Sequence, residues 1–590
     1  MNETEKKTKP RFDRSSLPFF GLVLVIGLFN LIWPKNYALY AIDHASFISP
    51  LFQFQWLLVI LGLLFLMARK GDRLKLPKAV LFVVAIAFIL SFFIFRSTFP
   101  SVHGDGEGGG SPHHGKPVLK EFPKYDARLQ SFLGYGLSRL LPENVRFNYN
   151  FTSLHINHPV NSAWLILLLL VGAGLVIRLT WLAERSSMSN EAALGFLLTT
   201  LASAAGLNAY GHFDSYLIPI ALLTAWLLTL YKTHQNPGRK IWWVVLFAGL
   251  PVITWAHPVL LYIAGYAGLF GFLLLLKRRL PLWLLLAGAV LYGWAPFAIG
   301  RGYHDFFDPT LRHLVGWMLH EKTMALLQAA LPALFLIVLL LIRRTVDVSQ
   351  PIQSVALFMA VSASILIFTL RLGYGLLDEF LYSMFGVLIT GAALLLFLTS
   401  REKPQLLLYT GLLSLFLFFP RVYLYAGERL LDRFEQHLPR EYTKSNLFHG
   451  PYKLLAMNVP LNTKKLQDRR LGLLEKGFLE PEPAWEKHRD RSLAFYIVWC
   501  YEFDQLERTR GLLERLIDRN SDTLLYLWLE EPDPFQTRSY RGVSKRMIRR
   551  ACRQILGRKL AANPDNEQLQ IMSRTLLAID RRGGRMPEAP

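Results

Sequence analysis

Long apolar runs recur along the first 425 residues of the chain, and each is about as long as a membrane-spanning helix. A helix rises about 1.5 Å per residue, so about 20 mostly apolar residues cross the hydrocarbon core of a bilayer. Counting such runs predicts about thirteen spans. The predicted spans are 17–34, 50–68, 79–96, 162–181, 191–209, 214–231, 241–257, 258–276, 281–299, 325–342, 352–370, 380–399 and 406–425.

The polar segments between these runs predict how the chain crosses the membrane. The residues before the first run are basic, so we expect the N-terminus in the cytoplasm. Most predicted inner loops, such as 69–78 and 232–240, are short and basic, as the positive-inside rule requires. Thirteen spans then place the C-terminal region outside, together with four other segments. These predicted outer segments are 97–161, 208–216, 300–324 and 371–379.

After residue 425 the apolar runs stop, and charged residues alternate with apolar ones at helical spacing. This pattern predicts amphipathic helices packed against one another. We therefore predict two domains, a multi-span membrane domain over 1–425 and an extracytoplasmic helical domain over 426–590. A tetratricopeptide-like array is one arrangement of the second domain. Its basic surface could bind anionic headgroups or an acidic polymer, or could simply be solvated.

Composition supports this fold class, an all-α polytopic membrane protein. Of the 590 residues, 52% are hydrophobic and only 18% are charged, which is too few charges for an ordinary soluble chain of this length. The net charge of +22 fits basic loops rather than disorder, because the chain is rich in large apolar residues. Two cysteines exclude a disulfide scaffold. An outer-face domain also predicts no nucleic-acid partner.

The first outer segment opens with two carboxylates, Asp105 and Glu107, on a glycine-rich backbone just beyond an apolar run. Glycine lets the backbone turn sharply and lets a ligand approach closely. A carboxylate at a membrane mouth can act as a general base or bind a cation. A solvated acidic loop explains the same residues. Further along, 129–141 has the spacing of an amphipathic helix that lies in the membrane interface.

The second outer segment, 208–216, carries His212, Asp214 and Tyr216 between two apolar runs. A carboxylate at that depth is costly unless it is paired, hydrated or functional. Asp214 could simply cap the helix that follows, because a helix N-terminus favours negative charge. In the functional interpretation, the three side chains line a cavity beneath the first outer segment.

Together, these residues resemble the C-type (GT-C) glycosyltransferase superfamily, whose members use sugars carried on polyprenyl phosphates. The turn Gly104-Asp105-Gly106 and the stretch 211–216 are similar to motifs of a bacterial subgroup. Asp214 stands where that subgroup has glutamate, and more than one span precedes the acidic turn where many members have one. The resemblance covers residues 79–400 in architecture and about a dozen residues in motif.

The resemblance implies an inverting transfer on the outer face of a bacterial inner membrane. Asp105 would be the general base, with Glu107 as its partner or substitute. The leaving lipid phosphate needs a cation where charge develops, and Arg301 and Arg371 are the candidates. Both arginines could instead anchor helix ends at the headgroups. His257 could contact the sugar or phosphate, or form a structural turn with the proline after it.

The expected partners are a polyprenyl-phosphate-linked sugar, a glycan, lipid or protein acceptor, and membrane lipids. No cofactor is certain, and a divalent cation is left open. The main alternative is a transporter or flippase of a lipid-linked or anionic substrate. Such a protein should carry charged or broken helices near the membrane midplane. The predicted spans have almost no charge there, which favours chemistry at the outer surface.

Overall fold

The computed structural model describes a chain of helices, with no strand among the described residues. Contacts divide the chain into two compact units, one of residues 1–148, 157–437 and 458–460, the other of 149–156, 438–457 and 461–590. The described residues of the first unit are 12–35, 39, 41–70, 75–98, 159–185, 188–203, 206, 217–256, 262–276, 280–299, 317–369, 379–424 and 432. Those of the second are 469, 493–494, 497–498, 500–501, 506–519, 521, 523–528 and 540–581.

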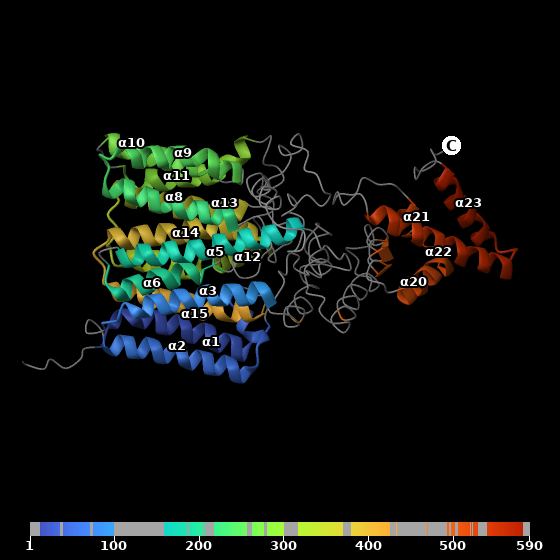
Figure 1. Cartoon of the computed structure of the whole chain (residues 1–590), viewed down its shortest axis with the longest axis horizontal. Coiled ribbons are helices and arrows are strands. Elements are labelled where there is room, and N and C mark those ends of the chain that lie inside the picture. The colour runs from blue at the N-terminus through green and yellow to red at the C-terminus, as the bar shows by residue number, and fades with distance from the viewer. Residues whose placement is uncertain are drawn as a thin grey trace, which may run out of the picture. The chain divides into compact units, whose positions relative to one another are not determined.

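The helices of the first unit lie side by side as a bundle (Figure 1), and each predicted apolar run overlaps one of them. Two short 3-10 helices, η1 (Arg14–Ser16) and η3 (Asp43–Phe47), accompany them. The bundle helices are α1 (Leu17–Ile32), α2 (Pro50–Lys70), α3 (Ala79–Thr98), α5 (Pro159–Arg185), α6 (Asn190–Leu201), α8 (Leu217–Gln235), α9 (Lys240–Ala256), α10 (Ile263–Leu276), α11 (Leu282–Ile299), α12 (Trp317–Ile342), α13 (Pro351–Thr369), α14 (Glu379–Thr399) and α15 (Pro404–Leu424).

Length and hydropathy identify this unit as a membrane domain. Six helices of the described residues are long and apolar enough to cross a bilayer: α1, α2, α12, α13, α14 and α15. Apolar stretches of 10–17 residues lie in α3, α9, α10 and α11. The predicted all-helical membrane protein is therefore confirmed, whereas the count of thirteen spans stays a prediction.

Burial separates inner helices from outer ones. Most side chains of α13 and α15 are buried by neighbouring helices. In contrast, α1 and α2 present large apolar side chains on their outward faces, and Leu51 is 68% exposed. In water such a surface would be costly, whereas lipid tails accept it, since they are as apolar as leucine.

One predicted boundary is wrong. The sequence predicts an outer loop over 300–324 and a span that starts at 325, but α12 begins at Trp317. Glu321 and Lys322 therefore lie in the first turns of this helix, where both side chains are buried. An adjacent acid and base end an apolar run in the sequence, although they do not stop a helix.

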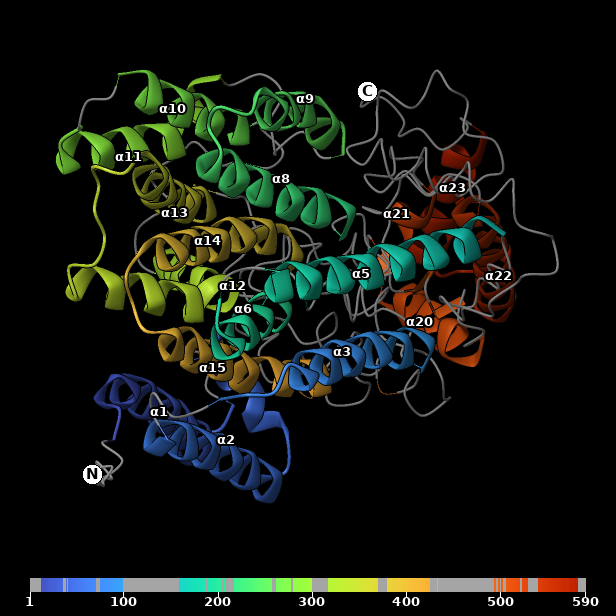
Figure 2. The ribbon, with the colours of Figure 1, turned by 60° about the vertical axis from the view of Figure 1, so that its left-hand side comes forward.

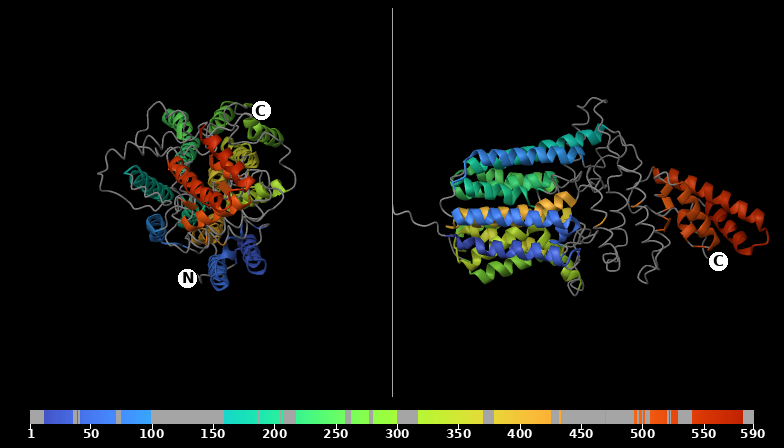
Figure 3. Two further views of the ribbon diagram at one scale, coloured as in Figure 1. Left: turned by 90° about the vertical axis from the view of Figure 1, so that its right-hand side faces the viewer. Right: turned by 90° about the horizontal axis from the view of Figure 1, so that it is seen from below.

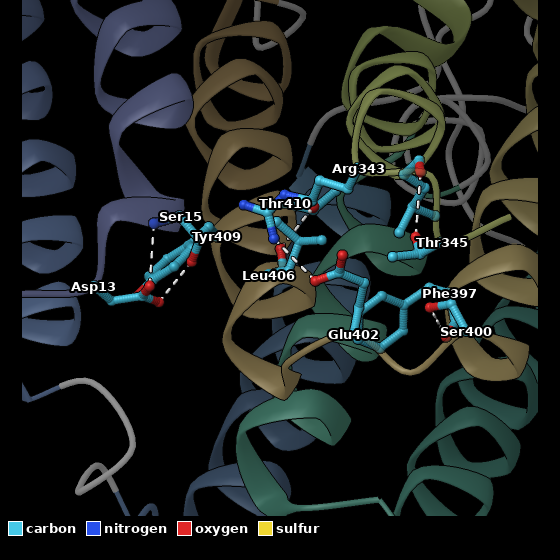
Figure 4. Close-up of polar contacts among 11 residues, drawn as sticks. Asp13, Ser15, Arg343, Thr345, Phe397, Ser400, Glu402, Leu406, Tyr409 and Thr410 are labelled. Carbon is cyan, nitrogen blue, oxygen red and sulfur yellow. Dashed lines mark hydrogen bonds and ion pairs between the residues drawn. The ribbon is translucent and has the colours of Figure 1, made fainter.

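Hydrogen bonds at one end of the bundle fix the direction of several helices (Figure 4). The carboxylate of Asp13 accepts from the Tyr409 hydroxyl at 3.1 Å, and the Asp13 backbone N–H donates to the Ala68 carbonyl at 2.9 Å. Arg343 and Glu402 form an ion pair at 2.9 Å. The N-terminal segment, the end of α2, the end of α12 and the start of α15 therefore meet here. We name this end of the bundle the Asp13 end.

Two further contacts join other chain segments to this set. Glu191, in the first turn of α6, accepts from the backbone N–H of Leu76 at 2.7 Å. Gln353, in the first turn of α13, donates to the Thr399 carbonyl at 3.0 Å. Helices α3, α6, α13 and α15 thus start together and run toward the opposite end, which we name the Arg421 end after the residue in the last turn of α15.

This arrangement agrees with the predicted alternation of the loops. The predicted outer segments 97–161, 208–216 and 371–379 follow α3, α6 and α13, which run toward the Arg421 end. Because α12 finishes at the Asp13 end, it starts at the Arg421 end, after the fourth segment. The side of the membrane on which each end lies stays a prediction.

Helices α6 and α15 pack closely against each other (Figure 2). Gly195 of α6 lies directly against the backbone of Leu407 and Leu408, and Gly411 of α15 lies against Gly195 and Leu198. Small residues at a helix contact let two backbones approach, which is a common mode of association in membranes. This contact sets the spacing of two walls of the site described below.

The second unit contains the helices α20 (Leu506–Asp518), α21 (Thr523–Trp528), α22 (Tyr540–Ala562) and α23 (Glu567–Arg581), drawn in orange and red in Figure 3. Their apolar sides face inward, and α20 buries Leu512, Leu513, Leu516 and Ile517. This is the amphipathic pattern that the sequence predicts. The tetratricopeptide-like arrangement stays a prediction.

Candidate functional site

The site residues predicted from the sequence all lie outside the described residues. They are Asp105, Glu107, His212, Asp214, Tyr216, His257, Arg301 and Arg371. The interfacial helix predicted over 129–141 also lies outside them. The structure therefore neither brings these residues together nor separates them, and their roles stay predictions.

A polar cavity lies between α6, α12, α14 and α15 of the membrane domain. Its polar lining consists of Thr199, Ser203, Gln328, Thr390, Ser414 and Arg421. The free volume is about 20 Å³, which holds one water-sized group rather than a whole sugar. Thr199 and Ser203 stand at the end of α6, and Arg421 stands in the last turn of α15. The cavity thus extends from the Arg421 end toward the middle of the bundle, where Thr390 and Ser414 lie at mid-helix.

A break in α12 forms one wall of this cavity. Pro332 lies inside the helix, and Ala330 has non-helical backbone angles, with φ at −149° and ψ at 17°. Proline has no N–H, so the carbonyl four residues earlier, that of Gln328, loses its helical donor. A side chain from another helix replaces that donor, because Arg421 Nη1 donates to the Gln328 carbonyl at 3.0 Å.

A second proline in the bundle is compensated in the same way by a neutral group. Pro420 lies inside α15, so the Phe416 carbonyl has no donor from its own helix. The Trp56 indole N–H of α2 donates to that carbonyl at 3.2 Å. A neutral donor is therefore enough to satisfy such a carbonyl within this bundle.

Two other buried polar groups of the cavity make no hydrogen bond within the part of the chain that the structure describes. They are the side-chain amide of Gln328, 4% exposed, and the hydroxyl of Thr199, 1% exposed. Leaving a buried polar group unsatisfied costs about 1–3 kcal/mol. Native proteins rarely keep such groups unless they bind a ligand, an ion or a water molecule. These groups, with Arg421, make the cavity the best candidate for a binding site.

The electrostatics of the cavity favour an anion. Arg421 is only 6% exposed, and a buried guanidinium in a membrane helix is costly unless polar or charged groups contact it. A guanidinium carries five N–H donors in a planar fork, and the contact with Gln328 uses one of them. Phosphate and carboxylate fit such a fork. The hydroxyl and amide groups of Thr199 and Gln328 can donate to the same anion.

A metal site has no support among the described residues, where no group of three His, Cys, Asp or Glu side chains could hold an ion. His103, His113 and His114 of the first outer segment are further candidate ligands and lie outside the described residues, so the divalent cation stays a prediction. In the second unit, burial raises the pKa of the Cys552 thiol to about 12. This thiol is therefore protonated at neutral pH and is a poor nucleophile.

A second cavity, of about 170 Å³, lies in the second unit between α20, α22 and α23. Asp518 and Lys559 line it and form an ion pair with each other. Their opposite charges compensate locally, and the other polar lining residues are amides such as Asn563 and Asn566. This cavity has no excess charge that would select a ligand, so we place the candidate site in the membrane domain.

Sequence reasoning missed the cavity, although two signals point to it. Arg421 follows Pro420 near the end of the predicted span 406–425, and Pro332 stands inside the predicted span 325–342. A proline in a span marks a carbonyl that needs a donor, and a buried arginine can supply one. That these two features meet could not be predicted, because Gln328 and Arg421 are 93 residues apart.

The proline break and the arginine should be energetically coupled. We expect Arg421→Leu to destabilise the protein by about 1–3 kcal/mol, because the Gln328 carbonyl loses its donor. Pro332→Ala restores a backbone N–H at position 332. In that background, Arg421→Leu should therefore cost about 1 kcal/mol less. Denaturant titration of the four proteins in detergent measures this coupling. Equal costs of Arg421→Leu in both backgrounds would show that the contact does not serve the broken helix.

Comparisons of the chain with protein-family models, curated proteins and solved structures gave no match. Function therefore has to be argued from the site itself.

Proposed function

We propose that this chain is a membrane glycosyltransferase, which moves a sugar from a polyprenyl-phosphate donor to an acceptor on the outer face of a bacterial inner membrane. The observation that carries the proposal is the buried arginine of the polar cavity at the Arg421 end. Arg421 lines the cavity with the Gln328 amide and the Thr199 hydroxyl, two buried groups without a hydrogen bond in the described part of the chain. A lipid phosphate supplies the anion that these groups suit.

In this proposal the carboxylate and the cation act on opposite sides of the anomeric carbon. The acceptor hydroxyl attacks that carbon and gives its proton to Asp105, with Glu107 or Asp214 as supporting acids. The bond between the anomeric carbon and the phosphate oxygen breaks, and the sugar is transferred with inversion. The polyprenyl phosphate leaves with the electron pair, and Arg421 stabilises the charge that develops on it. Arg301 and Arg371 stay candidates for the same task.

The small volume of the cavity limits what it would bind. About 20 Å³ accepts one phosphate oxygen, so the sugar would lie beyond the cavity, toward the predicted outer segments. There, His212, Tyr216 and His257 are the predicted sugar or phosphate contacts. The proposed topology has thirteen spans. Its Arg421 end faces outward, and its second unit is extracytoplasmic.

Transport of a lipid-linked or anionic substrate is the second candidate, and the break in α12 favours it. Broken helices with polar groups at mid-membrane depth are typical of transporter binding sites. Gln328 and the non-helical Ala330 lie in the interior of α12, about 16 Å or more from its first residue at about 1.5 Å per residue. A transporter would bind the same anion but would leave its sugar–phosphate bond intact.

A turnover assay on purified protein tests the proposal. We would offer a panel of polyprenyl-phosphate sugars and measure release of polyprenyl phosphate. Asp105→Asn should lower turnover about 10²- to 10⁴-fold, the usual contribution of a general base. Asp347→Asn is the matched control. Asp347 follows α12 at the Asp13 end of the bundle, opposite the end where the predicted outer segments lie.

The proposal is supported if the wild type and Asp347→Asn consume a donor and Asp105→Asn does not. That outcome identifies a transferase with Asp105 as its base. Normal turnover by Asp105→Asn would be consistent with a transferase but would show that Asp105 is not its general base. If every donor stays intact while a labelled lipid-linked sugar crosses proteoliposomes, the protein is a transporter and the proposal is wrong.

A further inference from the structure

Helix α22 of the second unit concentrates positive charge. Its 23 residues include eight lysines and arginines and no aspartate or glutamate. The neighbouring helices are balanced instead, with three basic and three acidic residues in α20 and two of each in α23. The excess positive charge is therefore a property of this one helix and not of the whole unit.

One side of α22 is committed to packing. Ile548, Cys552 and Ile555 are buried, at 3% exposure or less. Two of the basic residues also serve the fold. Arg549 donates to the Leu527 and Trp528 carbonyls at 2.8 and 2.9 Å, which caps α21, and Lys559 pairs with Asp518.

The other side of α22 carries the arginines Arg550, Arg553 and Arg558, all exposed. At about 100° per residue, they fall within an arc of about 140° on the helix. Met547 lies within the same arc and is 43% exposed, so an apolar side chain stands among the charges. We name these four residues the basic face of α22.

We propose that the basic face of α22 binds the phosphate headgroups of anionic membrane lipids. Arginine binds phosphate through two N–H groups at once, and a cluster of basic residues on an amphipathic helix is the usual signature of such binding. The exposed Met547 favours a membrane over a soluble polyanion, because its thioether can enter the boundary of the acyl chains. The membrane domain of the same chain also keeps lipid at a high effective concentration.

Full-length protein in nanodiscs of neutral phosphatidylcholine provides the test. Vesicles of phosphatidylcholine, with or without about 30% phosphatidylglycerol, would be added, and the protein that sediments with them would be measured. We expect association with the anionic vesicles only, weakened by raising NaCl from about 0.1 to 0.5 M. The triple change Arg550→Gln, Arg553→Gln and Arg558→Gln should lower the partition coefficient about 100-fold, at about fivefold for each arginine.

A second triple variant separates the basic face from total charge. Arg510→Gln, Arg515→Gln and Arg574→Gln remove three exposed arginines from α20 and α23, with the same loss of net charge. We expect this control to associate like the wild type. Equal loss in both triple variants would overturn the proposal, because total charge would then explain binding. Association with soluble polyglutamate as tight as with anionic vesicles would overturn it too, in favour of an acidic polymer.

Discussion

Replacing Gly195 with valine will prevent stable folding of the membrane domain. A Cβ atom at this position would lie 2.4–2.5 Å from the backbone of Leu407 and Leu408, closer than side-chain carbons approach other atoms. The clashing atoms belong to the backbone of α15, so no rotamer change relieves the contact, and α6 and α15 must separate. We expect a loss of about 3 kcal/mol or more, at the upper end of the cost of overpacking. Thermal unfolding in detergent, followed by size-exclusion chromatography, measures it.

Gly62→Val is the matched control for this change. Gly62 also lies inside a bundle helix, but a Cβ atom there meets nothing within 4 Å. Valine at this position should leave the unfolding midpoint close to that of the wild type. If Gly195→Val unfolds at the same temperature as Gly62→Val, the helices α6 and α15 are not in backbone contact, and the cavity between them is described wrongly.

Removing the charge of Arg421 should nearly abolish turnover even where the protein still folds. If Arg421 stabilises the leaving phosphate, Arg421→Gln should lower turnover about 10²- to 10³-fold, as the loss of one preorganised donor to a developing anion does elsewhere. Arg421→Lys keeps the charge but loses the planar fork, so its loss should be smaller. Polyprenyl phosphate release by the folded variants gives both values.

Pro332→Ala separates this chemical role from the structural one. In that background the Gln328 carbonyl regains a backbone donor, so Arg421→Gln should unfold at nearly the same midpoint as its parent protein. Turnover should still fall. If Pro332→Ala restores turnover to Arg421→Gln, the arginine serves only to satisfy the broken helix, and another cation stabilises the phosphate.

Much of the helical fold could be predicted from the sequence, because apolar runs of span length report burial in lipid or in neighbouring helices. A predicted helix boundary was wrong where polar residues lie inside a helix. The predicted span starts at 325, but α12 starts at Trp317, since Glu321 and Lys322 are buried within a helix instead of ending it. The amphipathic character of the region after residue 425 was predicted correctly, and α20 buries Leu512, Leu513, Leu516 and Ile517.

The cavity could not be predicted, because it depends on contacts between distant segments. In the sequence, Arg421 stands near the end of one predicted span and Pro332 stands inside another, and nothing there relates the two. Only the packing of α12 against α15 shows that one supplies the donor that the other removes. The spacing that Gly195 and Gly411 set between α6 and α15 is equally invisible in a single sequence.

The central claim is that the cavity at the Arg421 end binds a lipid phosphate, and equilibrium binding tests it most directly. Labelled polyprenyl phosphate would be titrated against purified wild type, Arg421→Gln and Arg343→Gln. Arg343 is the control, because it carries the same charge at the Asp13 end and pairs there with Glu402. We predict saturable binding by the wild type and by Arg343→Gln, and at least tenfold weaker binding by Arg421→Gln. Equal affinity of all three proteins would contradict the claim.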